Sequence, residues 1–317
     1  MKRIHVTDRK VWKRCRRRYS WEKEGLRKPS DKFSGALWFG TGIHEALARQ
    51  SLEGIDPVVA WIEFCGKSLV SSMYCPEFDR DKFFADQDLG TSMLSRYSFW
   101  EETQEPYKIL GTEVELEIKI PGTNVILVGT VDRIIEYRGR TWVVDHKTAT
   151  TMPKIEELEL DDQMTAYIYM MSKLGYNPAG AIYNVLRKKI PDTPQVLTKG
   201  GLSTRKSIDT TYAIYLDAIH KIGARTEDYF EILERLQKNK FFTREEIYRS
   251  KIMLDNFERY LLSEAREMTS IRTIEFPNMT RDCVWDCPYL PLCRCVNDGG
   301  DIELLKESLY EIGEVRK

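Results

Sequence analysis

Gly129-Thr-Val-Asp132-Arg-Ile-Ile and Val143-Val-Asp145-His-Lys147 are two apolar, β-branched stretches that carry two aspartates and a lysine. They predict successive β-strands joined by a tight turn, so that the backbone forms a meander with a buried face. Two carboxylates placed together repel each other, and a divalent cation offsets this repulsion well. Because side chains alternate along a strand, Lys147 faces the same side as Asp145, within reach of a water molecule or a phosphate oxygen. The pattern is typical of a Mg²⁺-dependent phosphodiesterase centre, although most isolated Asp-x-Lys pairs are only solvated ion pairs.

Three further motifs lie in an order that fits such a centre. In the first, a glycine-flanked helix start carries His44 about one turn in, although a lone helical histidine is more often structural than a ligand. In the second, Gln163 and Tyr167 are four residues apart on a helix, which is also the pattern of an ordinary amphipathic helix. The third is an alternating strand with three glutamates on one side, most simply a solvated face: Glu113, Glu115 and Glu117.

Taken in order, these motifs resemble the PD-(D/E)XK nuclease superfamily, and within it the RecB-like branch. That branch includes AddB-type and CRISPR-associated exonucleases and many phage-encoded relatives. The resemblance extends over roughly residues 10 to 295, which is nearly the whole chain. Val131 stands where the superfamily's name has proline, a departure that is common among RecB-like members. The segment from Gly200 to Tyr212 also resembles phage members of the group.

The resemblance implies an enzyme that hydrolyses DNA phosphodiester bonds with Mg²⁺ or Mn²⁺. Lys147 would orient or help deprotonate the attacking water and neutralise developing charge. Gln163 and Tyr167 would contact the DNA strand near the scissile phosphate. The implied metal ligands are His44, Asp132, Asp145 and the backbone carbonyl of His146, with Glu113 as a weaker candidate.

Four of the seven cysteines crowd into the segment from Cys283 to Cys295. No secretory segment precedes them, so we expect no disulfide framework, and clustered thiols in a reducing compartment indicate a metal site. A structural zinc site normally shows paired Cys-x-x-Cys knuckles, which this sequence lacks. Cys65 and Cys75 have no partners of suitable spacing and are interpreted as packing residues.

The RecB-like iron–sulfur nucleases hold a 4Fe–4S cluster with one cysteine near the N-terminus and three near the C-terminus. Cys15 occupies the matching N-terminal position. The resemblance implies that Cys283, Cys287 and Cys293 complete the set, and Cys295 is an alternative last ligand. This sequence departs from the usual pattern because three residues, rather than two, separate the first two C-terminal cysteines. Such a cluster would act as a staple rather than as a redox catalyst.

Composition sets the outer limits. With 317 residues and 42% hydrophobic content, the chain can bury one sizeable core plus a helical appendage. No apolar run approaches membrane-spanning length, so we expect a soluble, cytoplasmic protein of a bacterium or of a phage-infected cell. The net charge of −1 indicates no particular partner. We therefore expect no membrane association.

Positive charge is unevenly distributed along the chain. The first twenty residues carry nine Lys and Arg against one Asp. Such a run is a solvated face or, with Trp12 and Tyr19 among its charges, a nucleic-acid contact. A second basic region comprises Lys188, Lys189, Lys199, Arg205 and Lys206.

The expected fold is α/β, with a restriction-endonuclease-like core in the order helix, three-strand meander, helix, strand. Helices are predicted over 7–26, 40–53 and about 159–174, and strands over 110–147 and 179–186. One nuclease domain spans 1–317. Within it we expect a helical insertion over 57–105, a helical region over 208–268, and a cysteine cluster over 281–295 that closes onto Cys15.

The sequence thus predicts a metal-dependent DNA nuclease, specifically an exonuclease of the RecB-like type in DNA processing or recombination. Its substrate would be single-stranded DNA or duplex ends, and a helicase or a recombinase would be its partner. Two other classes stay open: a catalytically inactive RecB-like DNA-binding or assembly protein, and a zinc-stapled nucleic-acid-binding module. The intact Asp132, Asp145 and Lys147 argue against the first of these.

Overall fold

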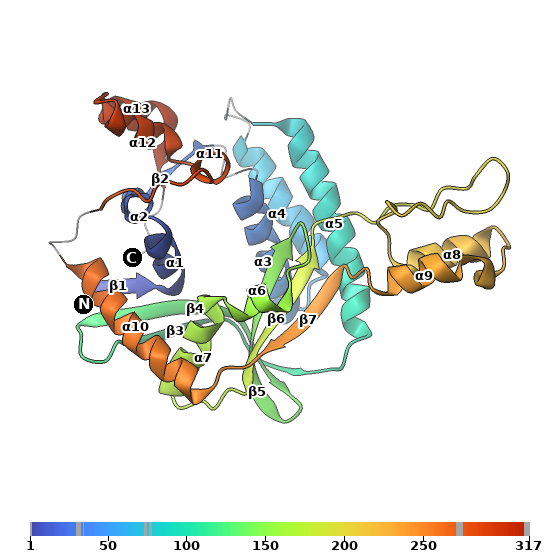
Figure 1. Ribbon diagram of the computed structural model, residues 1–317, viewed down its shortest axis with the longest axis horizontal. Coiled ribbons are helices and arrows are strands. Elements are labelled where there is room, and N and C mark those ends of the chain that lie inside the picture. The colour runs from blue at the N-terminus through green and yellow to red at the C-terminus, as the bar shows by residue number, and fades with distance from the viewer. Residues whose placement is uncertain are drawn as a thin grey trace.

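A mixed, six-stranded β-sheet forms the centre of the computed structural model, which describes residues 2–29, 33, 35–72, 75, 78–270 and 275–313 (Figure 1). The strand order is β1-β4-β5-β6-β7, with β3 paired to β4 off this path. Strands β3, β4 and β5 form an antiparallel meander, whereas β6 runs parallel to β5 and β1 parallel to β4. The strands are β1 (Lys2–His5), β3 (Lys108–Lys119), β4 (Val125–Tyr137), β5 (Arg140–Ala149), β6 (Gly180–Arg187) and β7 (Phe242–Ile247).

Strand β4 has different neighbours along its length. One edge is followed by β3 almost throughout, and the other edge is shared by β1, which pairs with 125–128, and β5, which pairs with 133–137. Within the described chain, residues 129–132 therefore have no strand beside them on that second edge. Strand β5 leaves β4 after Val144 and continues paired only with β6. The sheet is thus open at a notch beside Asp132.

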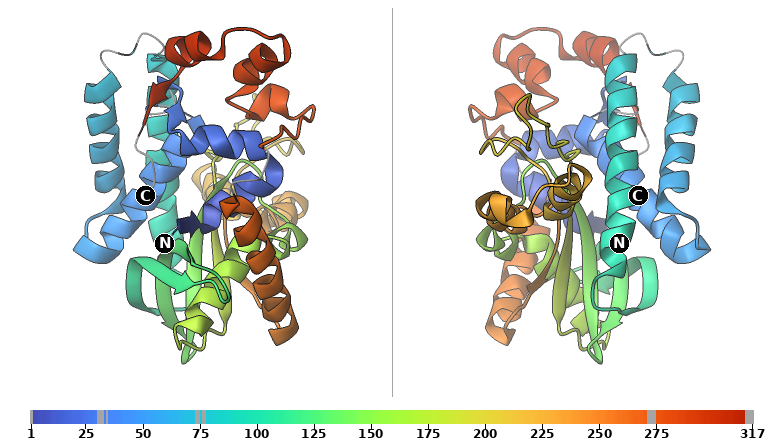
Figure 2. Two further views of the ribbon diagram at one scale, coloured as in Figure 1. Left: turned by 90° about the vertical axis from the view of Figure 1, so that its left-hand side faces the viewer. Right: turned by 90° about the vertical axis from the view of Figure 1, so that its right-hand side faces the viewer.

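Helices cover the sheet on both faces (Figure 2). The helices α1, α7 and α10 pack their apolar side chains against the sheet in the largest core cluster. The helices α3, α4 and α5 form a second cluster, rich in aromatic rings, whose contact with the sheet includes Leu186. Their bounds are α1 (Val6–Arg14), α3 (Gly35–Glu53), α4 (Pro57–Ser72), α5 (Arg80–Glu102), α7 (Asp162–Lys173) and α10 (Lys251–Thr269).

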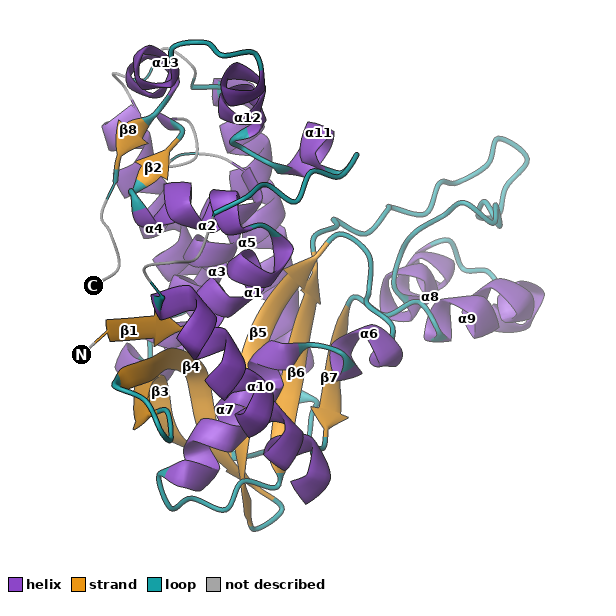
Figure 3. Cartoon of the chain, turned by 60° about the vertical axis from the view of Figure 1, so that its left-hand side comes forward, coloured by secondary structure: helices purple, strands orange, loops and turns teal. Residues whose placement is uncertain are grey.

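Two smaller units lie outside this core, each with its own apolar cluster (Figure 3). One is an arm between β6 and β7, made of α8 (Tyr212–Lys221), the 3₁₀-helix η2 (Thr226–Tyr229) and α9 (Phe230–Gln237). The other joins N-terminal and C-terminal segments, because β2 pairs with β8 and Tyr289 Oη donates to Leu26 O at 2.7 Å. Its elements are α2 (Arg16–Lys23), β2 (Leu26–Arg27), α11 (Cys283–Asp286), α12 (Leu290–Asn297), α13 (Ile302–Leu309) and β8 (Glu311–Ile312).

Much of the expected architecture is present. The class is α/β with a central mixed sheet, and the order helix, three-strand meander, helix, strand is that of α3, β3–β5, α7 and β6. The turn between β4 and β5 lies at Arg138-Gly139, and α4 begins at Pro57. No helix in the described ranges combines the length and the apolar character needed to cross a membrane.

The structure differs from the sequence predictions where long-range pairing decides the conformation. Strand β1 was not expected, and β7 lies inside the segment 208–268, for which helices were expected. Strand β7 contains two glutamates and an arginine, good helix formers, but its pairing with β6 outweighs that local preference. The helix expected over 7–26 is interrupted at Cys15, and the one expected near 159 is divided into α6 (Ile155–Glu159) and α7.

Candidate active site

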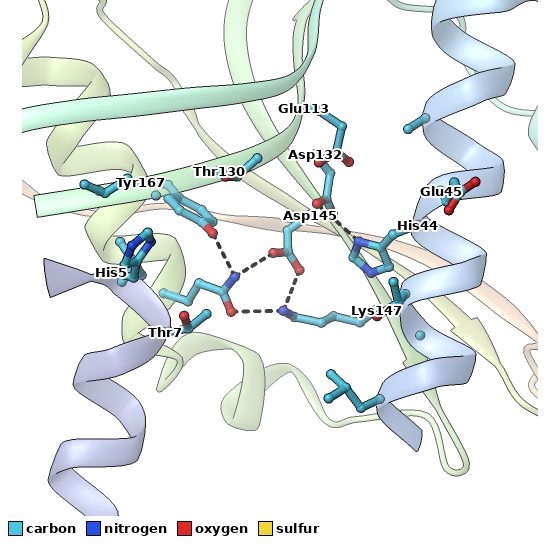
Figure 4. Close-up of a pocket in the computed structure, with 18 of the residues that line it drawn as sticks. His5, Thr7, His44, Glu45, Glu113, Thr130, Asp132, Asp145, Lys147 and Tyr167 are labelled. Atoms are coloured by element: carbon cyan, nitrogen blue, oxygen red, sulfur yellow. Dashed lines mark hydrogen bonds and ion pairs between the residues drawn. The ribbon is translucent and has the colours of Figure 1, made fainter. Parts of the chain in front are cut away.

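The notch in the sheet holds most of the predicted site residues (Figure 4). Helix α3 places His44 on one side of it, and α7 places Gln163 and Tyr167 on the other. The aspartates come from β4 and β5, in the middle of the strands rather than near their ends. The sequence motifs therefore converge from four elements on one cavity.

Close packing sets the position of His44. Helix α3 begins at Gly35, so His44 lies more than two turns into it rather than about one turn. Two residues before it, a Cβ on Gly42 would lie 2.5 Å from atoms of Trp61 and of Phe64 on α4. The absence of a side chain at Gly42 lets the two helices approach here, and this contact turns His44 towards the sheet.

Asp132 is held by two hydrogen bonds. His44 Nδ1 lies 3.2 Å from Asp132 Oδ1, and the backbone N–H of His146 donates to Asp132 Oδ2 at 2.6 Å. The His146 N–H would point at the β4 backbone if the ladder continued past Val144, and the Asp132 carboxylate accepts it instead. The side chain thereby satisfies a backbone donor at the open edge of the sheet.

Asp145, Lys147, Gln163 and Tyr167 form a second hydrogen-bonded group. Lys147 Nζ lies 2.8 Å from Asp145 Oδ2 and donates to Gln163 Oε1 at 3.0 Å. Gln163 Nε2 donates to Asp145 Oδ1 and to Tyr167 Oη, each at 3.0 Å. Asp161 caps α7 by accepting from Gln163 N, so Gln163 lies in the first turn of the helix.

Glu113 departs from the expected alternation of its strand. It has a positive φ of 50°, and β3 carries a register shift just before it, between Ile109 and Gly111. Glu115 and Glu117 form ion pairs with Arg3, whereas Glu113 lines the cavity beside Asp132 (Figure 4). Such a backbone conformation costs roughly 1–3 kcal/mol and tends to persist at functional sites. The weakest sequence candidate thus lies within the site.

Burial opposes the charge of His44, Asp132, Asp145 and Lys147, and neighbouring charges outweigh burial at all of them except Asp145. At Asp132 the hydrogen bond and charge of His44 outweigh burial and lower the pKa. At Asp145 burial prevails, helped by the charge of Asp132, and the pKa is raised. At Lys147 the Asp145 charge outweighs burial and raises the pKa, and at His44 Asp132 does the same. The two carboxylates thus differ in how readily they accept a proton.

The groups face a cavity of about 790 Å³. Beyond the predicted residues, it is lined by side chains that the sequence did not single out. Thr130 could have been found, since it lies two residues before Asp132 on β4. His5 is brought to the cavity by the pairing of β1 with β4, and Thr7 follows it at the start of α1. The added residues include His5, Thr7, Gly40, Glu45, Arg49 and Thr130.

The donors in the notch fit a hard divalent cation. Asp145 is buried and Asp132 is half-buried, both line one cavity, and carboxylate oxygens of this kind suit Mg²⁺ or Mn²⁺. In the described part of the chain, no three His, Cys, Asp or Glu side chains are placed closely enough to hold a metal ion. Instead, Asp132 bonds to His44, and Asp145 bonds to Lys147 and Gln163. His146 is not among the residues that line the cavity: its imidazole bonds to Asn184 and lies edge-on to His44, with ring centroids 6.1 Å apart.

A second, small cavity is lined by four of the cysteines. It contains Cys15, Cys283, Cys287 and Cys293, while Cys295 is not among its lining residues. Cys15 Sγ accepts the N–H of Arg18 at 3.5 Å and that of Asn278 at 3.4 Å. The cysteine set implied by the family resemblance is thus brought together, although its thiols do not converge on one metal position.

The N-terminal basic run is largely engaged in ion pairs within the protein. Arg14 pairs with Asp286, and Arg16 pairs with Glu267. Arg9 and Lys13 share Asp162 and Glu264, which fixes α1 against α7 and α10. These bonds leave less free positive charge for a nucleic acid than the sequence indicates.

Comparison with known proteins gives a family match over most of the chain. The family model described as the PD-(D/E)XK nuclease superfamily matches residues 6–294. A stretch of 107 residues is 29% identical to Protein EFR3 homolog A of Xenopus laevis, covering 32% of this chain and only 13% of that protein. The crystal structure of SSO0001 covers 91% of this chain and 87% of its own, at 13% identity. Its TM-score of 0.34 does not establish a shared fold.

Proposed function

Because this chain belongs to the PD-(D/E)XK nuclease superfamily, a group of metal-dependent nucleases, we propose that it hydrolyses phosphodiester bonds in DNA. The observation that carries the proposal is the convergence of His44, Asp132, Asp145 and Lys147 on one cavity of about 790 Å³. The notch leaves this cavity open at the edge of β4, where a phosphate can approach both carboxylates.

The residues take the following roles in the proposal. Asp132 and Asp145, with His44 and the carbonyl of His146, bind one or two Mg²⁺ or Mn²⁺ ions, and Glu113 is a further ligand. The bound cation supplies Lewis acidity, which makes water more acidic and stabilises negative charge on the phosphate. Lys147 Nζ, held 2.8 Å from Asp145 Oδ2, orients the attacking water and neutralises charge on the phosphate oxygens.

Gln163 and Tyr167 complete the proposed site. Gln163 bonds to both Lys147 and Asp145, so it fixes the distance between the Lys147 ammonium group and the Asp145 carboxylate. Tyr167 Oη accepts from Gln163 and thereby holds the amide in the orientation that these bonds need. Both side chains line the cavity, where the DNA strand next to the scissile phosphate would contact them.

We further propose an exonuclease of the RecB-like branch, active on single-stranded DNA or duplex ends alongside a helicase or a recombinase. This finer assignment rests on the ordered motifs His44, Asp132, Asp145-x-Lys147 and Gln163-x-x-x-Tyr167, including the phage-type relatives they resemble. It predicts that cleavage needs a free DNA end.

The four cysteines of the second cavity are proposed to hold a 4Fe–4S cluster. The proposal rests on the family resemblance of the cysteine pattern and on the fact that Cys15, Cys283, Cys287 and Cys293 line one cavity. Cys293 lines this cavity and Cys295 does not, which favours Cys293 as the last ligand.

The test is a cleavage assay on anaerobically purified protein with Mn²⁺ or Mg²⁺. Labelled linear single strands, linear duplexes and closed circular single strands are compared, with Asp132→Asn as the inactive variant and Asp217→Asn, an exposed change on α8, as the matched control. We expect cleavage of linear substrates that Asp132→Asn abolishes. Binding of DNA without cleavage would instead favour an inactive assembly protein. A colourless protein with one zinc per chain would favour the zinc-stapled module.

A further inference from the structure

On the face of the sheet turned away from Asp145, the imidazole of His146 lies in a buried hydrogen-bonded chain. His146 and Asn184 are register partners on the parallel strands β5 and β6, and each is no more than 2% exposed. Asn184 Nδ2 lies 2.7 Å from His146 Nδ1 and 2.8 Å from Tyr97 Oη on α5. The chain therefore joins the strand of the proposed site to the helical pair α4–α5.

Glu101 fixes which groups donate and which accept along this series of hydrogen bonds. A carboxylate only accepts, and Glu101 Oε1 receives Tyr97 Oη at 2.9 Å as well as the Tyr107 hydroxyl and Arg244. The Tyr97 hydroxyl gives its one proton to Glu101, so it must accept from Asn184 Nδ2. The second N–H of the Asn184 amide then donates to His146 Nδ1.

His146 is consequently a neutral ring with its proton on Nε2. Its Nδ1 is an acceptor, and its Nε2 has no hydrogen-bond partner among the described residues, as is also true of Asn184 Oδ1. Leaving two buried polar atoms unpaired costs roughly 1–3 kcal/mol each. A polar chain kept at this cost, beneath the two carboxylates, points to a role other than stability.

The backbone of His146 connects the chain to the notch. Its N–H donates to Asp132 Oδ2 at 2.6 Å, and it lies between Asp145 and Lys147 on β5, past the point where β5 has lost its pairing with β4. Past Val144, the described part of β5 is therefore joined to β4 through the Asp132 carboxylate rather than by ladder hydrogen bonds, and a rotation of the His146 peptide would move both aspartates.

We infer that Asn184 and Tyr97 are positioning residues. They hold the His146 ring, and through it the His146 peptide, so that Asp132 and Asp145 keep the spacing that the metal cation requires. The inference rests on the proposed function only in naming that cation. Because Tyr97 belongs to α5, the helical insertion and the site share one hydrogen-bonded chain. A helix movement there would change the spacing of the two carboxylates.

Two variants remove this chain with little change of shape: Asn184→Leu and Tyr97→Phe. The matched control is Tyr215→Phe, which removes another fully buried hydroxyl, bonded to Ser203 O in the arm. The Kd for Mn²⁺ is measured by calorimetry without DNA, and kcat and KM are measured on an oligonucleotide. Partners of this kind typically change metal affinity or activity by roughly 10–100-fold. We expect a loss of that size in Mn²⁺ affinity and in kcat for Asn184→Leu, a smaller loss for Tyr97→Phe, and an unchanged KM.

The tautomer supplies a readout that does not depend on activity. The chain has four histidines, so a long-range ¹H–¹⁵N spectrum can assign His146, which we expect as the Nε2–H form in the wild type and altered in Asn184→Leu. A wild-type His146 protonated on Nδ1 would overturn the inference. So would variants that melt at a lower temperature, like Tyr215→Phe, but keep wild-type Mn²⁺ affinity and kcat. A wild type that binds Mn²⁺ yet cleaves no DNA would refute the proposed function. The Mn²⁺ affinities and the His146 tautomer would then still test this inference.

Discussion

His44 Nδ1 lies 3.2 Å from Asp132 Oδ1, although 88 positions separate the two residues in the chain. The contact joins α3 to β4 across the cavity. Burial works against a charged imidazole, but Asp132 outweighs it, and the pKa of His44 is raised. Asp132 thus makes His44 more basic than burial alone would leave it.

His44→Ala should lower Mn²⁺-dependent cleavage strongly, because it removes both a proposed ligand and the bond that orients Asp132. Raised Mn²⁺ concentration should restore part of the rate. His220→Ala, an exposed change on α8, serves as the control and should keep the wild-type rate. A His44→Ala protein with full specific activity and only a lower melting temperature would show that the ring is structural.

Asp132→Ala, Asp145→Ala and Lys147→Ala should each remove cleavage while the fold is retained. Each of them takes away a metal ligand or a charge that stabilises the phosphate, a loss that typically costs at least ~10²-fold in rate. The measurement is the initial rate with Mn²⁺, together with a circular dichroism spectrum. Near wild-type activity in any one of the three would refute the site assignment.

Gly129→Ala tests the packing behind the site. A Cβ at this position would lie 2.8 Å from Tyr167 Cε1 and 2.9 Å from Val6 Cγ2, so the tyrosine ring and its bond to Gln163 must move. We expect a destabilisation of about 1–3 kcal/mol, typical of overpacking, and a reduced kcat. Gly66→Ala is the control, since its Cβ meets nothing within 4 Å on the exposed side of α4, and it should stabilise by about 0.5–1 kcal/mol. Equal stability of the two variants would contradict this account.

Mn²⁺ should raise the melting temperature of the wild type, because it offsets the like charges of Asp132 and Asp145 on one cavity. A ligand at 100 times its Kd contributes about 2.7 kcal/mol. Asp132→Asn should lose most of this gain, whereas Asp217→Asn should keep it. An identical gain in wild type and Asp132→Asn, measured by scanning calorimetry, would place the cation elsewhere.

The cysteine variants should affect iron content and stability before chemistry. Cys15→Ala, Cys283→Ala, Cys287→Ala and Cys293→Ala should each lose the brown colour, absorb no light near 400 nm and give unstable protein. Closing so long a loop contributes several kcal/mol in the chain-entropy model. The control is Cys65→Ala, which is buried in α4 and should stay coloured.

Cys295→Ala decides the last ligand. Cys295 Sγ lies beside Gly300, where a Cβ would approach it to 2.9 Å, and it does not line the four-cysteine cavity. We therefore expect full iron content for Cys295→Ala. Loss of iron in this variant with retention in Cys293→Ala would exchange the two assignments. Full iron in Cys15→Ala would refute the staple.

Local pattern was enough for the residues that contact one another along one strand or one helix. Asp145 and Lys147 share a face because they are two apart, and their ion pair in the structure follows from that spacing. Gln163 and Tyr167 meet through the four-residue repeat of a helix. The meander could be predicted for the same reason, since each of its strands follows the last.

Features that depend on distant segments could not be predicted in this way. His5 reaches the cavity because β1 pairs with a strand more than a hundred residues later, and no local signal marks this. Glu113 enters the cavity through a positive φ and a nearby register shift, both of which the alternating pattern conceals. The bond between Asn184 and His146 likewise needs the parallel register of β5 and β6.

The residues that line the large cavity in the described chain all fall between His5 and Tyr167, whereas three of the four cysteines around the small one come from the last tenth or so of the sequence. A ribosome therefore delivers every wall of the notch well before it delivers Cys283. During synthesis, the residues of the large cavity can therefore assemble before Cys283, Cys287 and Cys293 have been made. The order of residues along the chain thus separates in time the building of the notch from the joining of the two ends.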